Sequence, residues 1–270
     1  KASIKQFMCR QGKEIITTSL AFSTPRTHTN ALLDLIQSLG PKKTKAPLVR
    51  LGPKGDGGYL VPDDLQGVYA LFSPGVSTIS GFEKDSASMG LKVYMADKSV
   101  DRPADVHPNF IFTKKYIGCV DDEDFMTLDS WIRTSLPEDC SGDLILQMDI
   151  EGAEYESIIS IPSSQLCRFR IIVVEFHSLD QLWSKPFFDL ASRAFAKLLR
   201  SHSCVHIHPN NCCGSLVFDG IGIPRVAEFT FLRNDRGVLP GRVESLPHPL
   251  DVDNTSNPTL DLHPVWIRRD

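Results

Sequence analysis

The sequence has no long apolar run and no excess of basic residues. No stretch approaches the roughly 18–20 consecutive apolar residues that a membrane-spanning helix needs, and no secretory signal peptide is visible. Lys and Arg together number 29 against 33 Asp and Glu, which gives a formal net charge of −4. Proteins that bind nucleic acid through its phosphates need a positively charged surface. The composition therefore predicts no membrane span and no nucleic acid as the main partner.

Several signature motifs are also missing. The glycine-rich segment Gly52–Gly58 lacks the Gly-Lys-Ser/Thr ending of a P-loop. There is no Gly-x-Ser-x-Gly nucleophile elbow and no His-Glu-x-x-His zinc motif. None of the seven cysteines forms a Cys-x-x-Cys pair, which argues against a zinc ribbon or a thioredoxin-type site. These absences exclude the commonest nucleotide-hydrolysing, ester-hydrolysing and zinc-dependent classes.

The cysteines leave the compartment open. Cys212 and Cys213 are adjacent, which is unusual. One interpretation is that most of the cysteines are small buried apolar residues; the other is that one or two disulfides form in a secretory lumen such as the Golgi. The glycosylation-type triplet Asn254-Thr255-Ser256 favours the lumen weakly. Both the secretory lumen and the cytoplasm remain compatible with the sequence.

Strand-like and helix-like segments alternate from Val68 onward. This alternation predicts an α/β fold with a mostly parallel sheet covered on both faces. Two further apolar segments, 204–208 and 227–232, have no helical pattern between them and predict an antiparallel pair that closes the sheet. The expected strands are 68–72, 91–95, 110–113, 144–148 and 170–176, and the expected helices are 81–89, 128–136, 153–161 and 186–201.

Composition divides the chain into three parts. Residues 1–46 are polar and mixed and contain one expected helix at 31–39, so they are interpreted as a helical extension. Residues 47–235 hold the alternating segments and form the main domain. Residues 236–270 are rich in Pro and Asp, which predicts an irregular tail packed on that domain.

Ligands of an open parallel sheet bind at the carboxyl ends of its strands. The first expected strand is followed by Ser73-Pro74-Gly75-Val76-Ser77, whose glycine lets a ligand approach the backbone closely. Asp97 follows the second strand, about 20 residues after that glycine, as expected for a carboxylate that binds ribose hydroxyls. On their own, these two segments are also compatible with an ordinary turn and a surface acid.

The fourth and fifth strands end in titratable groups. Residues 144–148 lead directly into Asp149 and then Glu151 and Glu154, and such clustered carboxylates repel one another unless they serve a cation, a proton or ligand donors. For Glu154 a simpler role is to complement the dipole of the helix that follows. Glu175 and His177 end the fifth strand and point to the same face.

This acid and imidazole suit two kinds of chemistry. They can act as bases in proton abstraction, or they can bind a divalent metal ion together with Asp149. His208, on the next strand, is expected to supply a further catalytic group. The predicted catalytic residues are therefore Asp149, Glu175, His177 and His208, and any metal ligands are predicted to be Asp149, Glu175 and His177.

The segment Leu146–Glu156, LQMDIEGAEYE, resembles the K-x-D-x-E-G-x-E signature of the FkbM-type methyltransferases. These enzymes use S-adenosylmethionine and mostly methylate oxygen. Gly55–Leu60 and Gly81-Phe82-Glu83 also look like one branch of that family, and the resemblance covers residues 50–234. It implies a class I methyltransferase fold, which is Rossmann-like and has seven strands, mostly parallel with an antiparallel last strand.

The resemblance also implies a cofactor site. The sequence departs from many class I methyltransferases in one respect, because its first loop has a single glycine instead of two or three. By position, the methionine part of S-adenosylmethionine would meet Ser73, Gly75 and Ser77. Its ribose region would meet Glu83 and Asp97, and its sulfonium would lie near Asp149. Gly58 and Tyr59 would help to close the site.

The implied function is O-methylation of a hydroxyl on a sugar, a glycan or a related polar small molecule. A hydroxyl must lose its proton during attack, which requires a base or a metal ion. Two alternatives stay open. An NAD-linked oxidoreductase would need the Gly-x-Gly-x-x-Gly motif that this chain lacks, and a degenerate methyltransferase fold would bind a glycan or a protein without catalysis.

Overall fold

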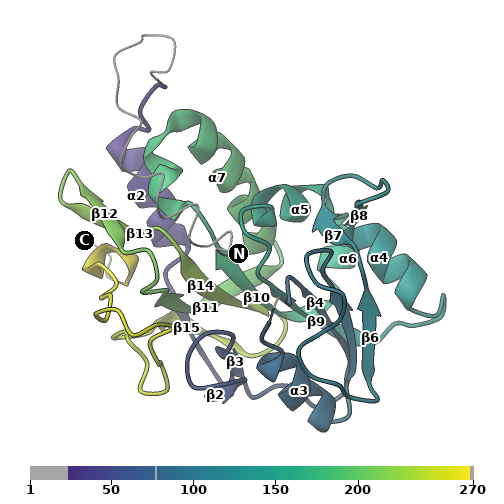
Figure 1. Ribbon diagram of the computed structural model, residues 1–270. Helices are drawn as coiled ribbons and strands as arrows, with labels where there is room; N and C mark the ends of the chain where they lie inside the picture. Colours follow the sequence, from purple (N-terminus) through teal and green to yellow (C-terminus); the bar gives the residue numbers. More distant parts are fainter. Residues whose placement is uncertain (1–23, 77, 268–270) are drawn as a thin grey trace.

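A seven-stranded mixed sheet forms the centre of the molecule (Figure 1). The computed structural model describes residues 24–76 and 78–267. In spatial order the strands are β6 (Phe110–Thr113), β5 (Lys92–Ala96), β4 (Val68–Pro74), β9 (Asp143–Met148), β10 (Phe169–Phe176), β14 (Ala227–Arg233) and β11 (His202–Pro209). Strand β14 is antiparallel to both of its neighbours and every other neighbouring pair is parallel. This confirms the predicted α/β sheet of the class I methyltransferase type, in which the last strand is reversed.

The predicted helices are found with shifts of one or two residues at their ends, the usual uncertainty of a helix boundary. Figure 1 shows α4, α5 and α7 on one side of the sheet. The helices are α2 (Thr29–Ser38), α3 (Gly81–Ser88), α4 (Leu128–Ser135), α5 (Glu154–Ser160), α6 (Ser163–Leu166) and α7 (Lys185–Leu199), with 3₁₀ turns at Leu179–Trp183 and Pro264–Trp266. Among the described residues, no helix has the length and apolar character required to cross a membrane.

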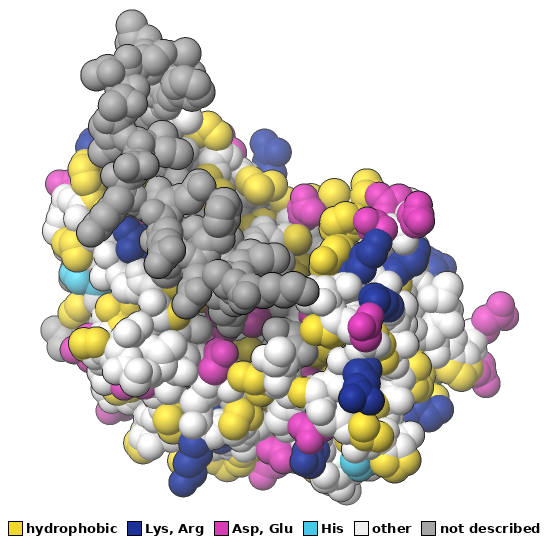
Figure 2. Space-filling view, viewed as in Figure 1, with side chains coloured by type: hydrophobic (Ala, Val, Ile, Leu, Met, Phe, Trp, Pro, Cys, Tyr) yellow, Lys and Arg dark blue, Asp and Glu magenta, His cyan; other side chains and the backbone are white. Residues whose placement is uncertain are grey.

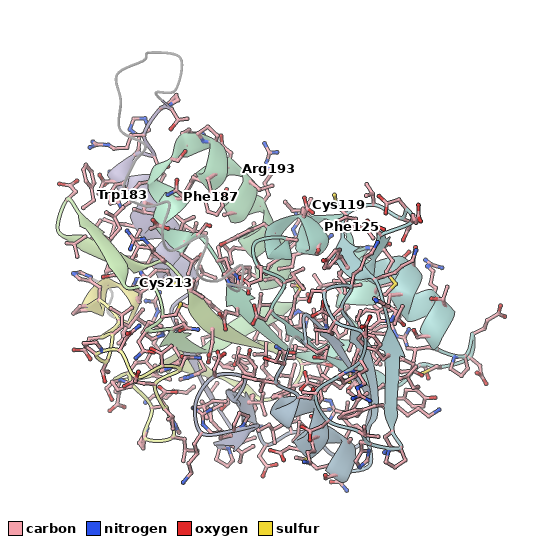
Figure 3. The ribbon with its side chains drawn as sticks, viewed as in Figure 1. Cys119, Phe125, Trp183, Phe187, Arg193 and Cys213 are labelled. Carbon is pink, nitrogen blue, oxygen red and sulfur yellow. The ribbon has the colours of Figure 1, made fainter. Side chains whose placement is uncertain are left out.

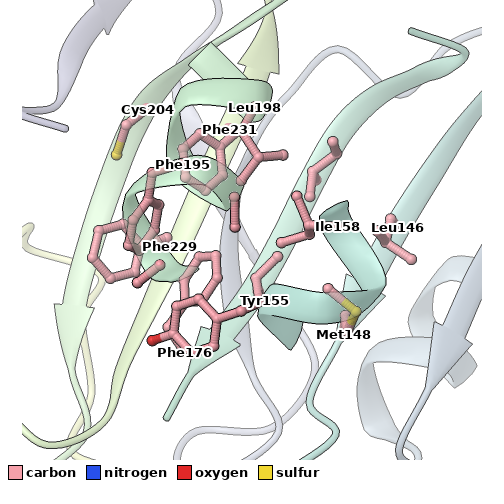
Figure 4. Packing of buried hydrophobic residues seen from close by; sticks show 14 of the residues in the cluster. Leu146, Met148, Tyr155, Ile158, Phe176, Phe195, Leu198, Cys204, Phe229 and Phe231 are labelled. Atoms are coloured by element: carbon pink, nitrogen blue, oxygen red, sulfur yellow. The ribbon is translucent and has the colours of Figure 1, made fainter. Parts of the chain in front are cut away.

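Aromatic side chains pack between α5, α7 and the sheet (Figure 4). The ring of Phe176 on β10 lies 4.6 Å from that of Phe195 on α7 and 5.2 Å from that of Tyr155 on α5. Phe229 on β14 completes this group at 5.4 Å from Phe176. Each such buried ring contributes about 1.5–3 kcal/mol relative to an exposed one. Burial of Phe176 in this core therefore determines which side chains of β10 face the helices and which face the opposite side of the sheet.

The opposite face of the sheet carries polar side chains near the carboxyl ends of the strands. It is covered by α3 and by a hairpin of β2 (Leu48–Leu51) and β3 (Tyr59–Pro62), where Thr230 Oγ1 on β14 donates to the carbonyl of Leu60 at 2.6 Å. Because side chains alternate along a strand, Glu175 lies on this hairpin side while its neighbour Phe176 faces the helices. The hairpin therefore lies over the acidic strand ends.

Three parts of the described chain differ from the sequence-based prediction. The tail is not irregular throughout, because β15 (Val238–Arg242) pairs with β1 (Lys42–Thr44). Its Pro240 and Gly241 conceal the strand pattern in the sequence. Between β11 and β14, where no element is predicted, a hairpin forms from β12 (Ser215–Phe218) and β13 (Ile221–Pro224). A further pair joins β7 (Tyr116–Gly118) to β8 (Phe125–Thr127).

The N-terminal part and the tail are both attached to the main domain. The predicted helix at 31–39 is α2, whereas residues 1–23 of the predicted extension lie outside the described residues. In the tail, Trp266 is fully buried, and its indole N–H donates to the carbonyl of Gly222 at 3.2 Å. This hydrogen bond joins the tail to β13.

Candidate active site

The carboxyl ends of β4, β5 and β9 meet at one edge of the sheet. The Gly75 N–H donates to the carbonyl of Ala96 at 2.9 Å, and the Asp149 N–H donates to that of Pro74 at 3.3 Å. Gly75 has a φ of +86°, and a Cβ added there would lie 1.6 Å from the carbonyl oxygen of Asp149. Only glycine therefore allows the loop after β4 to lie this close to the end of β9.

Three carboxylates surround one ring nitrogen of His177. Its Nε2 lies 3.4 Å from Glu151 Oε2, 3.7 Å from Glu175 Oε1 and 3.8 Å from Asp149 Oδ1. Donor atoms of Asp149, Glu151 and His177 all lie within 4.8 Å of one another, which is close enough for them to share a metal ion. This group contains two of the three predicted metal ligands, Asp149 and His177, with Glu151 in place of Glu175, whose carboxylate lies beside it.

The other ring nitrogen of His177 is held by Glu154. Glu154 Oε1 accepts hydrogen bonds from the backbone N–H groups of Gly152 at 2.9 Å and Ile150 at 3.2 Å, and it lies 3.0 Å from His177 Nδ1. An ionised carboxylate only accepts, so Nδ1 carries a proton and Nε2 faces the other carboxylates. Glu154 is fully buried. Its carboxylate therefore connects the turn after β9 to His177, in addition to the helix-dipole role suggested by the sequence.

The acids around His177 determine its charge. Burial lowers the pKa of the imidazole, but the hydrogen bond from Nδ1 to Glu154 and the negative charges of Glu154, Asp149 and Glu175 outweigh this effect and raise the pKa to about 10. His177 is thus an imidazolium at neutral pH, and it balances part of the surrounding negative charge. In that state it cannot accept a proton.

Glu151 adopts a backbone conformation that is unfavourable for glutamate. Its φ is +56°, in the left-handed region, and the next residue is Gly152 with a φ of +115°. A non-glycine residue in this region costs about 1–2 kcal/mol. The tight turn after β9 directs the Glu151 carboxylate back toward His177, so the strain coincides with a contact in the acidic cluster.

His208 is not part of this cluster, contrary to the prediction that it acts with Glu175 and His177. The register pairs Glu175 with Glu228 and Glu228 with His208, so two strand spacings, about 10 Å, separate the backbones of Glu175 and His208. The ring of His208 instead faces the tail, with Nδ1 3.8 Å from Asp251 Oδ2. Alternation along single strands did not reveal that β14 lies between them.

Ser73 and Glu83 lie in a buried polar network. Ser73 Oγ lies 2.5 Å from Glu83 Oε1 and 2.6 Å from Gln147 Oε1, and Ser73 has no exposed surface. A hydroxyl has one proton, so it cannot donate to both oxygens. A protonated Glu83 that donates to Ser73 resolves the conflict. Burial, which outweighs the opposing effect of the hydrogen bond between Ser73 and Glu83, raises the pKa of Glu83 from 4.5 to about 7. These buried residues therefore support the loop after β4 from inside the protein.

The raised pKa of Glu83 predicts a pH-dependent stability. The folded chain holds this proton up to about pH 7, whereas the unfolded chain releases it near pH 4.5. The free energy of unfolding therefore falls by about 1.4 kcal/mol per pH unit between these values. Glu83→Gln, which cannot ionise, should match the wild type in urea unfolding at pH 5 and be about 2–3 kcal/mol more stable at pH 8. An equal gap at both pH values would contradict the buried, protonated acid.

Asp97 directly follows β5 and is buried. Its Oδ1 accepts from the backbone N–H of Ser99 at 2.7 Å and from its hydroxyl at 2.6 Å. Gly75 bonds to the residue before Asp97, so the two lie side by side. Ser77, the third predicted contact in the first loop, lies outside the described residues.

The glycine-rich segment Gly52–Gly58 forms a tight loop before β3. Arg50 Nη1 donates to the carbonyls of Gly58 at 2.6 Å and Pro53 at 3.1 Å. Tyr59 is buried, and its pKa is raised well above 10.0 by burial and then by the charges of Glu175 and Asp149. Its hydroxyl therefore stays neutral beside the acidic cluster, on the hairpin side of the sheet.

Comparisons with known proteins give little. No protein-family model matches the chain, and no curated protein does.

Three solved structures with partial similarity to this chain are described as methyltransferases. One is the 23S rRNA methyltransferase ErmE, with 9% identity, 80% of this chain and 72% of that chain covered and a TM-score of 0.35. Another is a mutant of the 16S rRNA (adenine(1408)-N(1))-methyltransferase from Catenulisporales acidiphilia, with 10% identity, 71% and 99% covered and a TM-score of 0.31. A third is an antibiotic-related methyltransferase, with 12% identity, 62% and 89% covered and a TM-score of 0.27. At such TM-scores these similarities carry no weight for activity, substrate or partner.

Proposed function

We propose that this chain is an FkbM-type, S-adenosylmethionine-dependent O-methyltransferase that acts on a hydroxyl of a sugar, glycan or related polar small molecule. The observation that carries the proposal is the cluster of Asp149, Glu151, Glu175 and His177 at the carboxyl ends of β9 and β10. It lies beside the tight glycine turn after β4, in a sheet with the reversed last strand of the class I methyltransferase type. This edge of a parallel sheet is where such folds bind their ligands.

The residues at this edge fit S-adenosylmethionine. Asp97 follows the end of β5, from where its carboxylate would bind ribose hydroxyls, and Gly75 has no side chain that would block the cofactor. Ser73 and Glu83 would hold that turn in place from within the protein, and Tyr59 would cover the site from the hairpin side. When bound, the cofactor supplies a methyl group on a positively charged sulfur, which makes that methyl electrophilic.

The chain must hold the acceptor hydroxyl and take its proton. Glu175 and Asp149 are carboxylates at the strand ends and can accept a hydrogen bond from a hydroxyl. His177, as an imidazolium, limits the electrostatic repulsion between these two carboxyl groups. Asn210 Nδ2 donates to Glu175 Oε1 at 3.2 Å, which orients the carboxylate. The transferred proton would thus pass to Glu175 or Asp149.

The same cluster fits a divalent metal ion. Asp149, Glu151 and His177 would hold it, with Glu175 next to them. The Glu154 carboxylate at Nδ1 is the partner that metal-binding histidines usually have on their other nitrogen. A divalent ion would lower the pKa of a coordinated hydroxyl. The ion would replace the proton on Nε2 of His177. The carboxylates would therefore have a positive charge among them with the ion as well as with the imidazolium.

A polar acceptor suits the surroundings of the cluster. The neighbouring side chains are carboxylates and amides, including Glu228, Asn210 and Asn254, where Asn254 Nδ2 donates to Glu228 Oε1 at 2.6 Å. Such groups recognise hydroxyls through hydrogen bonds. On the face seen in Figure 2, Lys and Arg are interspersed with Asp and Glu. This distribution favours a small polar acceptor over a nucleic acid backbone.

The direct test is methyl transfer to a panel of acceptors. The chain is incubated with S-adenosylmethionine labelled in its methyl group and with sugars, oligosaccharides and polar hydroxylated metabolites, with and without Mg²⁺ or Mn²⁺. The proposal predicts a product that has gained one methyl group on oxygen. Binding of a glycan without cofactor binding or turnover would instead support the degenerate fold, and binding of NAD would support the oxidoreductase.

The strain at Glu151 predicts opposite effects on stability and activity. Glycine adopts a positive φ freely, so Glu151→Gly should raise the free energy of unfolding by about 1 kcal/mol in urea titrations. The same change removes a carboxylate from the cluster, so turnover and affinity for Mn²⁺ should fall at least about tenfold. The matched control is Asp219→Gly, which has a φ of +53° in an exposed turn. It should be stabilised without loss of activity; equal activity in both variants would remove Glu151 from the site.

A further inference from the structure

Two adjacent cysteines lie in the turn that follows β11. Cys212 Sγ donates to Cys213 Sγ at 2.6 Å, and both residues are partly buried. Figure 3 labels Cys213 at this place, below the labelled Trp183 and at some distance from Cys119. The two sulfurs therefore touch in the reduced protein. No part of the proposed methyl transfer uses them.

A short chain of hydrogen bonds leads from this turn to the acidic cluster. The backbone N–H of Cys212 donates to Asn210 Oδ1 at 2.9 Å. The same Asn210 side chain donates through Nδ2 to Glu175 Oε1 at 3.2 Å. Asn210 is buried, so its amide is held mainly by protein groups. The orientation of Glu175 thus depends on the backbone position of Cys212.

Other contacts hold the turn from outside. Arg225 Nη1 donates to the carbonyl of Cys213 at 2.9 Å. Asn257 Nδ2, from the tail, lies 3.3 Å from the carbonyl of Cys212 and donates to that of Asn211 at 3.1 Å. These contacts fix the turn while the thiols are reduced. A change in the peptide between the two cysteines would disturb both sets of bonds.

We propose that Cys212 and Cys213 form a redox modification site: a low-molecular-mass disulfide such as glutathione disulfide converts them into a disulfide between neighbours, and this lowers activity at Glu175. The chemical modification stands independently of the proposed function, whereas its effect on turnover rests on it.

The exchange is balanced in two steps. The thiolate of one cysteine attacks the small disulfide, which forms a mixed disulfide and releases one small thiolate. The thiolate of the other cysteine then attacks the protein sulfur of that mixed disulfide, closes the Cys212–Cys213 bond and releases the second small thiolate. The two protons lost by the cysteines go to the two released thiolates. The cysteine pair is oxidised by two electrons and the small disulfide is reduced by two.

The geometry of the product explains both its lability and its effect. A disulfide between neighbours closes a small ring that includes their peptide bond, and a planar trans peptide does not fit such a ring without distortion. Strained disulfides are reduced more readily than relaxed ones, so the bond should be reversible. The distorted peptide shifts the turn, which weakens the bond from Cys212 to Asn210 and lets Glu175 change orientation.

The test uses the full chain equilibrated with glutathione disulfide, alkylated, and digested with trypsin without reduction. The fragment between Arg200 and Arg225 should lose the mass of two hydrogens, with the link assigned to Cys212 and Cys213 by fragmentation, and dithiothreitol should restore it. Cys213→Ser should not show this loss, whereas Cys119→Ser, a change at an exposed cysteine elsewhere, should. A pair that stays reduced, or that carries glutathione without closing the ring, would overturn the site.

Coupling to the cluster is measured separately. Oxidation should increase the deuterium exchange of the Cys212 amide and lower turnover at least about fivefold, with both effects absent in Cys213→Ser. The mass and exchange readouts need no methyl transfer, so they remain valid if the proposed function fails. A closed disulfide with unchanged exchange at Cys212 would overturn the coupling, and so would unchanged turnover in an active enzyme.

Discussion

Replacing Gly75 with alanine is expected to reduce the free energy of unfolding by at least about 3 kcal/mol. The added Cβ would lie 1.6 Å from the carbonyl oxygen and 2.6 Å from the carbonyl carbon of Asp149. Both are backbone atoms, so no side chain can rotate to make room. The ends of β4 and β9 would have to separate, which breaks the bond from the Asp149 N–H to Pro74. Urea unfolding measures the loss.

Gly90→Ala is the matched control for this change. Gly90 has a φ of +91°, close to that of Gly75, but a Cβ added there meets nothing within 4 Å. The free energy of unfolding of this variant should therefore fall only by the cost of a positive φ for a non-glycine residue, about 1–2 kcal/mol. The difference between the two variants isolates the contact with Asp149. Equal losses would mean that the loop after β4 is not pressed against the end of β9.

Replacing His177 with alanine is expected to lower turnover at least about 10²-fold while the affinity for S-adenosylmethionine changes little. Without the imidazole, the carboxylates of Asp149, Glu151 and Glu175 face one another without the positive charge between them. Their mutual repulsion would then move them apart. The acceptor hydroxyl would thereby lose its correctly placed proton acceptor. Initial rates and cofactor titrations on the same preparation separate the two effects.

His28→Ala controls for the loss of a histidine as such. His28 is exposed at the start of α2 and makes no capping hydrogen bond through its side chain. It should retain wild-type turnover. Thermal unfolding of both variants shows whether the His177 change acts through the fold. Turnover that survives in a folded His177→Ala variant would remove His177 from the mechanism.

The sheet could be predicted because its strands have distinct sequence patterns. Strand β10 is buried along its whole length and is rich in β-branched residues, as is typical of a central parallel strand. Strands β11 and β14 lack a helix between them, so an antiparallel pair was the expected arrangement. The tail strand β15 could not be predicted because Pro240 and Gly241 interrupt its pattern, and its pairing with the distant β1 has no local sequence signal.

The site could be predicted in part. Asp149, Glu175 and His177 end neighbouring strands, and parallel strands bring such ends together. Glu151 and Glu154 approach His177 only because of the left-handed turn after β9, which no sequence periodicity reveals. His208 was placed in the cluster because the sequence does not show that β14 inserts between β10 and β11. The role of Asn210 could not be predicted, because a hydrogen bond from a buried side-chain amide to a carboxylate has no sequence signal.

Isothermal titration calorimetry with S-adenosylmethionine tests the central claim most directly. If the carboxyl ends of β4, β5 and β9 form the cofactor site, the wild-type chain binds one molecule saturably. Asp97→Ala, which removes the acid expected at the ribose, then binds at least about tenfold more weakly while the fold is retained. Absence of heat from the folded wild-type chain, or equal affinity in the two proteins, would contradict the account.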